Sequence, residues 1–234
     1  MARVEVIELY PSPWSERLRW VLDVKGVPYA RRPYQPLAGE DELRRTTGHS
    51  TVPVFLADGE VVGDSDAAVD WLERHHPAPP LVPDDPVLRA QVRAWELAAT
   101  EALAPAGRLL FIGRVKTLDL QPLADHFAAK YAWSETAERR AERLVGSFVK
   151  EITEAVARSA YLVGDRFTRA DVTVATMVAG IIGHPPEDLF ALDAPMRAMF
   201  GLPLGGEPAL APLRGWRDAL YRRHRGRRVE PPAA

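Results

Sequence analysis

Apolar and polar positions alternate in two different ways at the start of the chain. From Val4 to Leu9, apolar and acidic residues partly alternate, which is typical of a short β-strand. Tyr10-Pro11-Ser12-Pro13 then ends this strand, because proline fixes φ and lacks an N–H donor. The apolar residues that follow recur with helical spacing and predict a helix that buries one face; they are Trp14, Leu18, Val21 and Leu22.

The same alternation of strand and helix patterns continues as far as Pro77. Asp58-Gly59 has the composition of a tight hairpin turn, and Asp64-Ser65 that of a helix start. The elements expected after the first helix are an extended segment at 27–34, a short helix at 40–45, a hairpin of strands at 52–56 and 60–62, and a helix at 64–76. Strands flanked by helices in this order predict a compact α/β unit.

A proline-rich connector separates this unit from a helical remainder. Five prolines lie in the segment 77–86, which is therefore stiff and cannot continue a helix. The rest of the chain has helical periodicity, so we expect an α/β domain followed by an all-α bundle. The expected boundaries are 1–78 for the first domain, 79–86 for the linker and 87–234 for the helical domain.

One segment of the helical domain has the pattern of a core helix. Val172–Ile182 is almost wholly apolar, which is typical of a buried helix. Thr168 and Asp171 before it have the spacing of a capping box. The remaining expected elements are helices at 86–111 (interrupted near Pro105 and Gly107), 121–131, 135–159 and 210–224, an ordered excursion at 183–208, and a frayed, solvated basic tail at 222–228.

Composition narrows the class of protein. Hydrophobic residues at 47% and charged residues at 26% are ordinary for a globular domain, and the formal net charge of −2 gives no reason to expect a nucleic-acid partner. No apolar run reaches the roughly 18 residues of a membrane span, and the N-terminus lacks a signal-peptide pattern. We therefore expect a cytoplasmic protein without a membrane partner. Arginine greatly outnumbers lysine, which is associated with GC-rich bacterial genomes.

The absence of cysteine limits the chemistry of the chain. It excludes disulfides, thiolate metal ligands and a protein thiol nucleophile. His75 and His76 are adjacent on a predicted helix and point in different directions, so we expect no metal site. Any sulfur chemistry must therefore come from a ligand.

Ser12 is the first candidate for chemistry, because it lies where the first strand meets the first helix. A helix start presents unpaired N–H groups and the positive end of the macrodipole, and it therefore favours an anion. The alternative is that the Ser12 hydroxyl simply caps the helix, as serine often does. The local sequence leaves both interpretations open.

Four motifs, in this order, resemble those of the cytosolic glutathione transferases over residues 4–182. They are Ser-Pro-Trp-Ser-x-Arg-Leu-Arg at 12–19, Thr-Val-Pro at 51–53, Asp-Ser at 64–65 and Gly-Asp-x-Phe-Thr-x-Ala-Asp at 164–171. The resemblance implies a thioredoxin-like domain that binds glutathione as co-substrate, followed by a helical bundle. It also implies a homodimeric transferase with a role in detoxification, similar to the serine-type zeta-like, tau-like or bacterial members.

The resemblance further implies roles for individual residues. Ser12 matches the serine that stabilises the glutathione thiolate, with Tyr10 and Ser15 as the alternatives. The residues that match the glutathione-binding positions are Val52 and Pro53 (a cis-proline turn that pairs with the cysteinyl unit), Ser65 (the γ-glutamyl carboxylate) and Asp64 (the γ-glutamyl ammonium, or only a helix cap). The loop 48–51 departs from the family spacing, and His49 together with Arg44 or Arg45 is the candidate for the glycine carboxylate.

A second pocket would take the electrophile. Its expected residues, between the two domains, are Tyr10, Trp14, Leu103, Gly107, Leu110 and Phe111. Apolar walls beside a thiolate favour conjugation to a small hydrophobic electrophile. A zeta-like isomerisation and a non-catalytic role in binding partners are the alternatives.

Overall fold

The computed structural model describes residues 4–202 and 206–232, and these form two compact units. The first consists of residues up to Leu81 together with the segment from Glu230, and the second of Val82–Val229. The change from one unit to the other lies inside the proline-rich segment 77–86. None of the described helices is both long and apolar enough to span a membrane.

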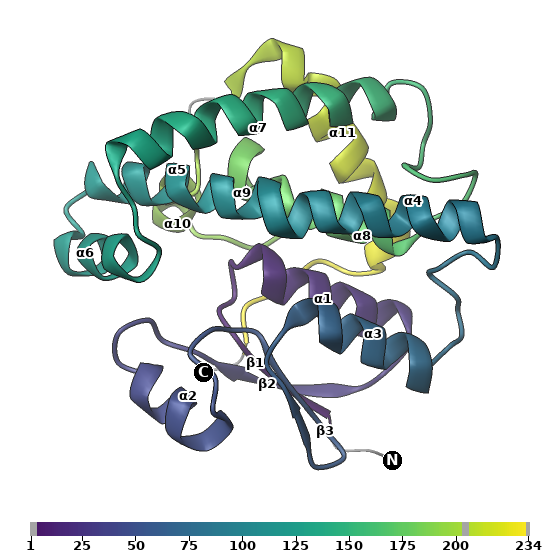
Figure 1. Ribbon diagram of the computed structural model, residues 1–234, viewed down its shortest axis with the longest axis horizontal. Coiled ribbons are helices and arrows are strands. Elements are labelled where there is room, and N and C mark those ends of the chain that lie inside the picture. The colour runs from purple at the N-terminus through teal and green to yellow at the C-terminus, as the bar shows by residue number, and fades with distance from the viewer. Residues whose placement is uncertain (1–3, 203–205, 233–234) are drawn as a thin grey trace. The chain divides into compact units, whose positions relative to one another are not determined.

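The first unit is built on a mixed four-stranded sheet with the strand order β2-β1-β3-β4 (Figure 1). The strands are β1 (Val4–Glu8), β2 (Tyr29–Pro33), β3 (Val54–Ala57) and β4 (Glu60–Val62). β1 pairs with β2 in parallel and with β3 in antiparallel, and β3 pairs with β4 in antiparallel. Asp58 and Gly59 both have positive φ, as the predicted hairpin turn requires.

Three helices cover the two faces of this sheet; they are α1 (Pro13–Val24), α2 (Glu40–Thr47) and α3 (Ser65–His75). Phe55 of β3 packs edge-on against Trp71 of α3. Its neighbour Val54 points to the opposite face, where it packs with Ile7 and with Leu43 of α2. The predicted α/β unit is therefore confirmed, with α2 on the face opposite α3.

The described elements of the second unit are helices, apart from a parallel bridge between Phe190 and Val229. Its elements are α4 (Pro86–Leu97), the π-helical turn η1 (Ala98–Leu103), α5 (Ala104–Lys116), α6 (Gln121–Lys130), α7 (Glu135–Val156), α8 (Arg169–Met177), α9 (Ala179–Ile182), α10 (Ala194–Met199), the short η3 (Pro208–Leu210), α11 (Ala211–Leu220) and the π-helical η4 (Tyr221–Arg225). The predicted break near Pro105 appears as the wide turn η1, because proline cannot donate to the carbonyl of the preceding turn and its ring clashes with it.

The core helix ends at Ile182 as predicted, but it starts earlier and is interrupted. α8 begins at Arg169, and every residue of it is buried. The helical run is interrupted at Val178 before α9, so it is not continuous from 172 to 182. The capping box is confirmed: the backbone N–H and the hydroxyl of Thr168 both donate to Asp171 Oδ2, at 2.8 and 3.0 Å. Asp171 Oδ1 also accepts from the N–H of Leu162 at 2.8 Å.

Burial makes Asp171 a source of pH-dependent stability. Burial raises the pKa of its carboxyl from 3.8 to about 6, against the lowering effect of its hydrogen bonds to Leu162 and Thr168. The folded state therefore holds this proton at higher pH than the unfolded state, and the corresponding stability is lost as pH rises from about 4 to about 6. The shift corresponds to a loss on the order of 3 kcal/mol.

We expect this loss to appear in urea unfolding of the wild type and Asp171→Asn between pH 4 and 7.5. The Asn side chain does not titrate. The unfolding free energy of the wild type should therefore fall relative to that of Asp171→Asn between pH 4 and 6, and the difference should then stay constant. A difference that stays constant across this range would contradict the assignment.

The basic tail is ordered, contrary to the prediction of a frayed terminus. Arg225 is buried, and Val229 is buried and bridges Phe190 in parallel. Arg228 pairs with Glu187, and its Nε donates to the Glu187 carbonyl at 2.7 Å. An apolar residue to bury and an acidic partner distant in sequence hold the segment, and neither is visible in its local composition.

The excursion after α9 is also ordered where it is described, as predicted. Arg197 of α10 donates to the carbonyls of Pro185 and Phe190, each at 2.8 Å, and pairs with Glu187. Part of the predicted range, residues 203–205, lies outside the described residues.

Candidate functional site

Ser12 is the N-cap residue of α1, but its hydroxyl does not cap the helix. Its backbone N–H donates to the carbonyl of Leu9 at 2.9 Å, and its own carbonyl accepts from the N–H of Glu16 at 3.0 Å. Within the described part of the chain, the side chain of Ser12 makes no capping hydrogen bond, and the residue is half-buried. The hydroxyl therefore stands at the positive end of α1, where it can donate to an anion.

The two alternatives to Ser12 are less suited to activating a thiol. Ser15 is completely buried, so its hydroxyl is not exposed to a ligand. The Tyr10 ring faces the guanidinium groups of Arg19 and Arg31, at 5.2 and 5.7 Å from its centroid. Burial raises the pKa of the Tyr10 hydroxyl above its ordinary value, despite the lowering effect of Arg19, and this disfavours its ionised form.

The start of α3 presents two of the predicted residues. Asp64 is its N-cap, and Oδ1 accepts from the N–H groups of Asp66 and Ala67 at 2.6 and 3.1 Å. Asp64 is exposed, whereas Ser65 is buried. The capping interpretation of Asp64 is thus confirmed, and its exposed position leaves room for a ligand as well.

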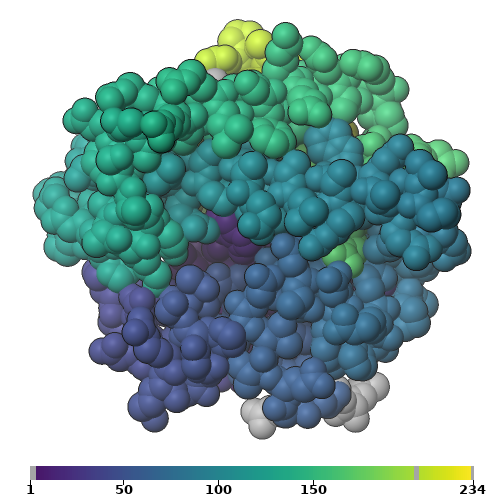
Figure 2. Space-filling model, viewed as in Figure 1, coloured from purple at the N-terminus to yellow at the C-terminus, as the bar shows by residue number. Residues whose placement is uncertain are grey.

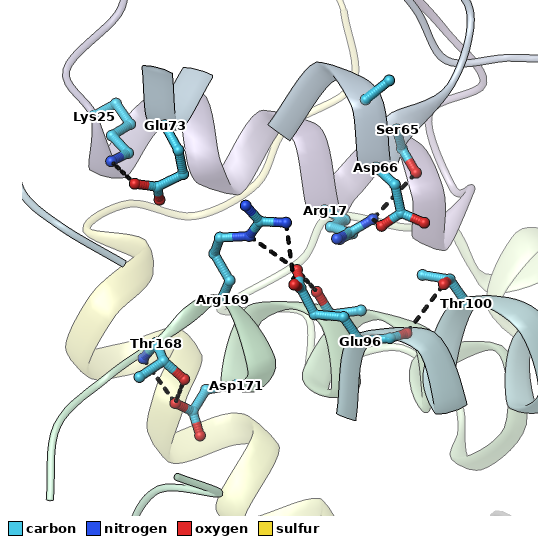
Figure 3. A network of polar contacts seen from close by, with 12 residues as sticks. Arg17, Lys25, Ser65, Asp66, Glu73, Glu96, Thr100, Thr168, Arg169 and Asp171 are labelled. Atoms are coloured by element: carbon cyan, nitrogen blue, oxygen red, sulfur yellow. Dashed lines mark hydrogen bonds and ion pairs between the residues drawn. The ribbon is translucent and has the colours of Figure 1, made fainter. Parts of the chain in front are cut away.

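Arg17 ties this helix start to α1 and was assigned no role from the sequence. Its Nη1 lies 3.4 Å from Ser65 Oγ and also pairs with Asp66 (Figure 3). The Arg17 side chain is fully buried. It therefore fixes the Ser65 hydroxyl relative to α1. The signal available in the sequence was only an arginine within the first motif, which does not reveal a partner on another helix.

The loop before α3 also meets His49. A Cβ atom added to Gly63 would lie 2.0 Å from His49 Nδ1, so the imidazole lies directly over this glycine. The Val52–Pro53 peptide bond is cis, as the resemblance implied. The N-terminal unit thus brings His49 beside the residue that precedes Asp64.

We expect Gly63→Ala to displace the His49 imidazole, since the new methyl group would occupy its place. If His49 binds the glycine carboxylate of glutathione, Gly63→Ala and His49→Ala should each weaken glutathione binding by at least about tenfold, the lower end of the value of a hydrogen bond to a charged group. Calorimetry measures this loss.

Gly215→Ala is the matched control, because a Cβ there meets no atom within 4 Å. It should bind glutathione like the wild type. Unchanged affinity in both test variants would remove His49 from the site.

The remaining predicted pocket residues differ in exposure. Trp14 and Tyr10 of the first unit are half-buried. In the second unit, Leu103 is fully buried, and a Cβ on Gly107 would lie 2.9 Å from Ile181 Cγ1, so Gly107 is a position of close helix packing. Phe111 is half-buried and stacks on Phe200, with ring centroids 4.8 Å apart.

Acidic and histidine side chains offer little for a metal ion. Across residues 4–202 and 206–232, no three His, Asp or Glu side chains lie together in a group that could hold one.

Sequence comparison places the chain among known proteins. Residues 6–80 match the family described as glutathione S-transferase, N-terminal domain. The chain is 30% identical over 170 residues to a probable maleylacetoacetate isomerase of Caenorhabditis elegans, covering 71% of this chain and 73% of that one. It is 27% identical to maleylacetoacetate isomerase of Rattus norvegicus, covering 79% and 87% of the two chains.

Solved structures agree with this result. A glutathione S-transferase from Methylobacterium radiotolerans, in complex with glutathione sulfonate, aligns with a TM-score of 0.64 at 26% identity over 89% of this chain and 93% of that one. A theta class glutathione S-transferase from Xanthomonas axonopodis pv. citri, with glutathione bound, has the same fold, with a TM-score of 0.71 at 22% identity over 99% of each chain. The chain described here belongs to the glutathione S-transferase family.

Proposed function

We propose that the protein binds glutathione on its N-terminal unit and uses the Ser12 hydroxyl to stabilise the thiolate for attack on a hydrophobic electrophile. The observation that carries this proposal is the position of Ser12 at the start of α1, with a hydroxyl that does not cap the helix. Family membership supports it, because relatives of known structure have glutathione or glutathione sulfonate bound.

The energy required is within reach of these groups. A free thiol has a pKa near 8.5, so lowering it by about two units takes roughly 2.7 kcal/mol of preferential thiolate stabilisation. A hydrogen bond to a charged acceptor contributes about 1.5–3 kcal/mol, and a helix N-terminus adds a further part. The hydroxyl donates its proton to the sulfur without losing it, and the thiol proton passes to solvent.

We assign each remaining part of glutathione to residues that offer the matching type of contact. The backbone of Val52, next to the cis Pro53, pairs with the cysteinyl unit as a short added strand. Ser65, held by Arg17, binds the γ-glutamyl carboxylate at the start of α3, and Asp64 takes the γ-glutamyl ammonium. His49 binds the glycine carboxylate. We also propose the domain boundaries 1–78, 79–86 and 87–234.

For the electrophile, we propose contacts with apolar and aromatic side chains. Trp14 and Tyr10 lie within two residues of Ser12, and Phe111 with its partner Phe200 offers aromatic surface on the second unit. Leu103 and Gly107 support the same helical region from within its packing. An enzyme of this kind would serve detoxification in the bacterial cytoplasm.

A second candidate is a glutathione-dependent isomerisation, because several relatives carry the name maleylacetoacetate isomerase. One feature of the second unit favours an acidic substrate: the half-buried Arg108 guanidinium lies 4.2 Å from the centre of the Tyr131 ring, one helical turn from Phe111. This site would place a cation beside aromatic surface.

Two measurements test these proposals. Calorimetry with glutathione should show binding, and a panel of apolar electrophiles and of maleyl diacids should then separate conjugation from isomerisation. Binding without turnover of any substrate in the panel would favour a non-catalytic role in binding partners. Failure to bind glutathione at millimolar concentration would overturn the proposal.

We further propose that the protein is a homodimer, with a two-fold contact formed by the helix faces at 62–76 and 87–111. Figure 2 shows helix α4 at the surface of the second unit, where Val87 is 63% and Leu97 40% exposed. We expect light scattering at micromolar concentration to give twice the chain mass of 25.9 kDa. A purely monomeric mass would contradict this.

A further inference from the structure

Three buried charged side chains and one half-buried arginine lie together beside the turn that carries Ser12. They are Glu8 at the end of β1, Glu16 and Arg19 of α1, and Arg31 of β2. Glu8 is 0% exposed, Glu16 2% and Arg19 1%. Burying charges is costly, and a pair of this kind can often be replaced by apolar residues without loss of stability. Stability alone therefore does not explain why the chain carries this cluster of charges.

Arg19 occupies the centre of this cluster. Its Nε and Nη2 donate to Glu16 Oε2 at 2.9 and 2.7 Å, and its Nη1 pairs with Glu8. Glu8 Oε1 in turn accepts from Arg31 Nε at 2.7 Å. Two carboxylates on different elements thus hold the Arg19 guanidinium in one orientation. Because this group is planar and rigid, its remaining N–H groups then donate in fixed directions.

The same guanidinium reaches the backbone of the turn. Arg19 Nη2 donates to the carbonyl oxygen of Tyr10 at 3.0 Å. The N–H of Ser12 donates to Leu9, so residues 9–12 form one tight turn. The residue after Tyr10 is Pro11, which has no N–H, so the Tyr10 carbonyl is the only hydrogen-bonding group of the Tyr10–Pro11 peptide unit. Arg19 therefore holds the one group by which this peptide plane can be oriented.

We propose that Arg19 is a positioning residue for thiolate stabilisation: by holding the Tyr10 carbonyl, it fixes the turn that presents the Ser12 hydroxyl. This inference rests on the role of Ser12 proposed above. Arg31 extends the same network, because its Nη1 donates to the carbonyl of Glu230 at 2.7 Å and so connects the C-terminal segment to the cluster. A displaced turn would leave glutathione bound but its sulfur poorly stabilised.

Arg19→Lys tests the proposal. Lysine keeps the positive charge beside Glu8 and Glu16, but its single ammonium group cannot bridge both carboxylates and also hold the Tyr10 carbonyl. The pKa of bound glutathione is read from the ultraviolet absorbance of the thiolate against pH, and affinity from calorimetry. We expect this pKa to rise by about one unit, a tenfold loss of thiolate at low pH. The glutathione Kd, measured below the wild-type pKa where the thiol form binds, should change less than about threefold.

Arg32→Gln is the matched control, because Arg32 is the next residue on β2 and pairs with Glu5 of β1 at 2.9 Å, away from the turn. It should leave the thiol pKa unchanged. If Arg19→Lys does not fold, Glu16→Gln replaces it, since it keeps an oxygen near Arg19 while weakening its hold. A smaller rise of the thiol pKa is then expected.

Ser12→Ala separates this proposal from the one on which it rests. If Ser12→Ala leaves the thiol pKa unchanged, the role of Ser12 is wrong and Arg19 has no hydroxyl to position. If Ser12→Ala raises the pKa but folded Arg19→Lys or Glu16→Gln retains the wild-type value, only the role of Arg19 is overturned. Failure of both variants to fold also overturns it, because the cluster would then be scaffold.

Discussion

Replacing Ser12 with alanine is expected to raise the apparent pKa of bound glutathione by about one to two units, because the thiolate loses a hydrogen bond worth about 1.5–3 kcal/mol. At a constant pH below the wild-type pKa of bound glutathione, the rate of conjugation should fall by roughly 10- to 100-fold. Glutathione affinity measured below the wild-type pKa should change little, since the thiol form binds there and the remaining contacts of the tripeptide are retained. The measurement is the pH–rate profile together with the ultraviolet titration of the thiolate.

Two variants serve as controls for Ser12→Ala. Ser15→Ala removes a hydroxyl three residues along the same helix that is completely buried, so it should not shift the profile. Tyr10→Phe removes a hydroxyl that stays protonated, because burial raises its pKa. This variant should likewise leave the pKa of the glutathione thiol unchanged. An unchanged profile in Ser12→Ala, or a shift in Tyr10→Phe, would transfer the role to another residue.

Replacing Arg169 with methionine is expected to lower the free energy of unfolding by about 3–5 kcal/mol, because it leaves the buried Glu96 carboxylate without its main counter-charge. Arg169 Nε and Nη2 donate to Glu96 Oε1 and Oε2 at 3.0 and 3.1 Å, and both side chains are at most 5% exposed (Figure 3). At roughly 2–4 °C per kcal/mol for a chain of this size, the melting temperature should fall by about 10 °C.

Arg139→Met is the matched control for Arg169→Met. Arg139 pairs with Glu135 at 3.6 Å, but both side chains are more than half exposed, so its loss should cost less than about 1 kcal/mol. Combining Arg169→Met with Glu96→Gln should restore part of the stability, because no charge then remains buried alone. A melting temperature within about 2 °C of the wild type in Arg169→Met would show that the pair is solvated.

Local sequence was sufficient for most elements of both units. The strand before Ser12, the Asp58-Gly59 hairpin, the cap at Asp64 and the capping box of Thr168 and Asp171 all appear as predicted. Each depends on hydrophobic period, turn chemistry or hydrogen bonds between residues at most a few positions apart. Such interactions are complete within a short window, so a single sequence reveals them.

The basic tail at 222–228 is held by interactions that its local sequence does not reveal. Local composition favours a frayed, solvated terminus at 222–228. The segment is largely exposed but not frayed, because Arg228 pairs with Glu187 and Val229 bridges Phe190. These partners lie about forty residues away in the chain. A charged segment becomes ordered only when the fold brings it a counter-charge and a place to bury its apolar residue, and neither is part of its own pattern.

Some features of the candidate site are likewise visible in the sequence, and others only in the folded structure. The sequence by itself placed Ser12 between a strand and a helix, and the motif order pointed to Pro53 and Ser65. Only the tertiary structure decided that the Ser12 hydroxyl does not cap α1, that Arg17 reaches Ser65 from 48 positions away, and that Arg19 holds the turn from a buried pair of carboxylates. These features depend on the packing of α1 against α3 and the sheet, because that packing sets which buried charges meet.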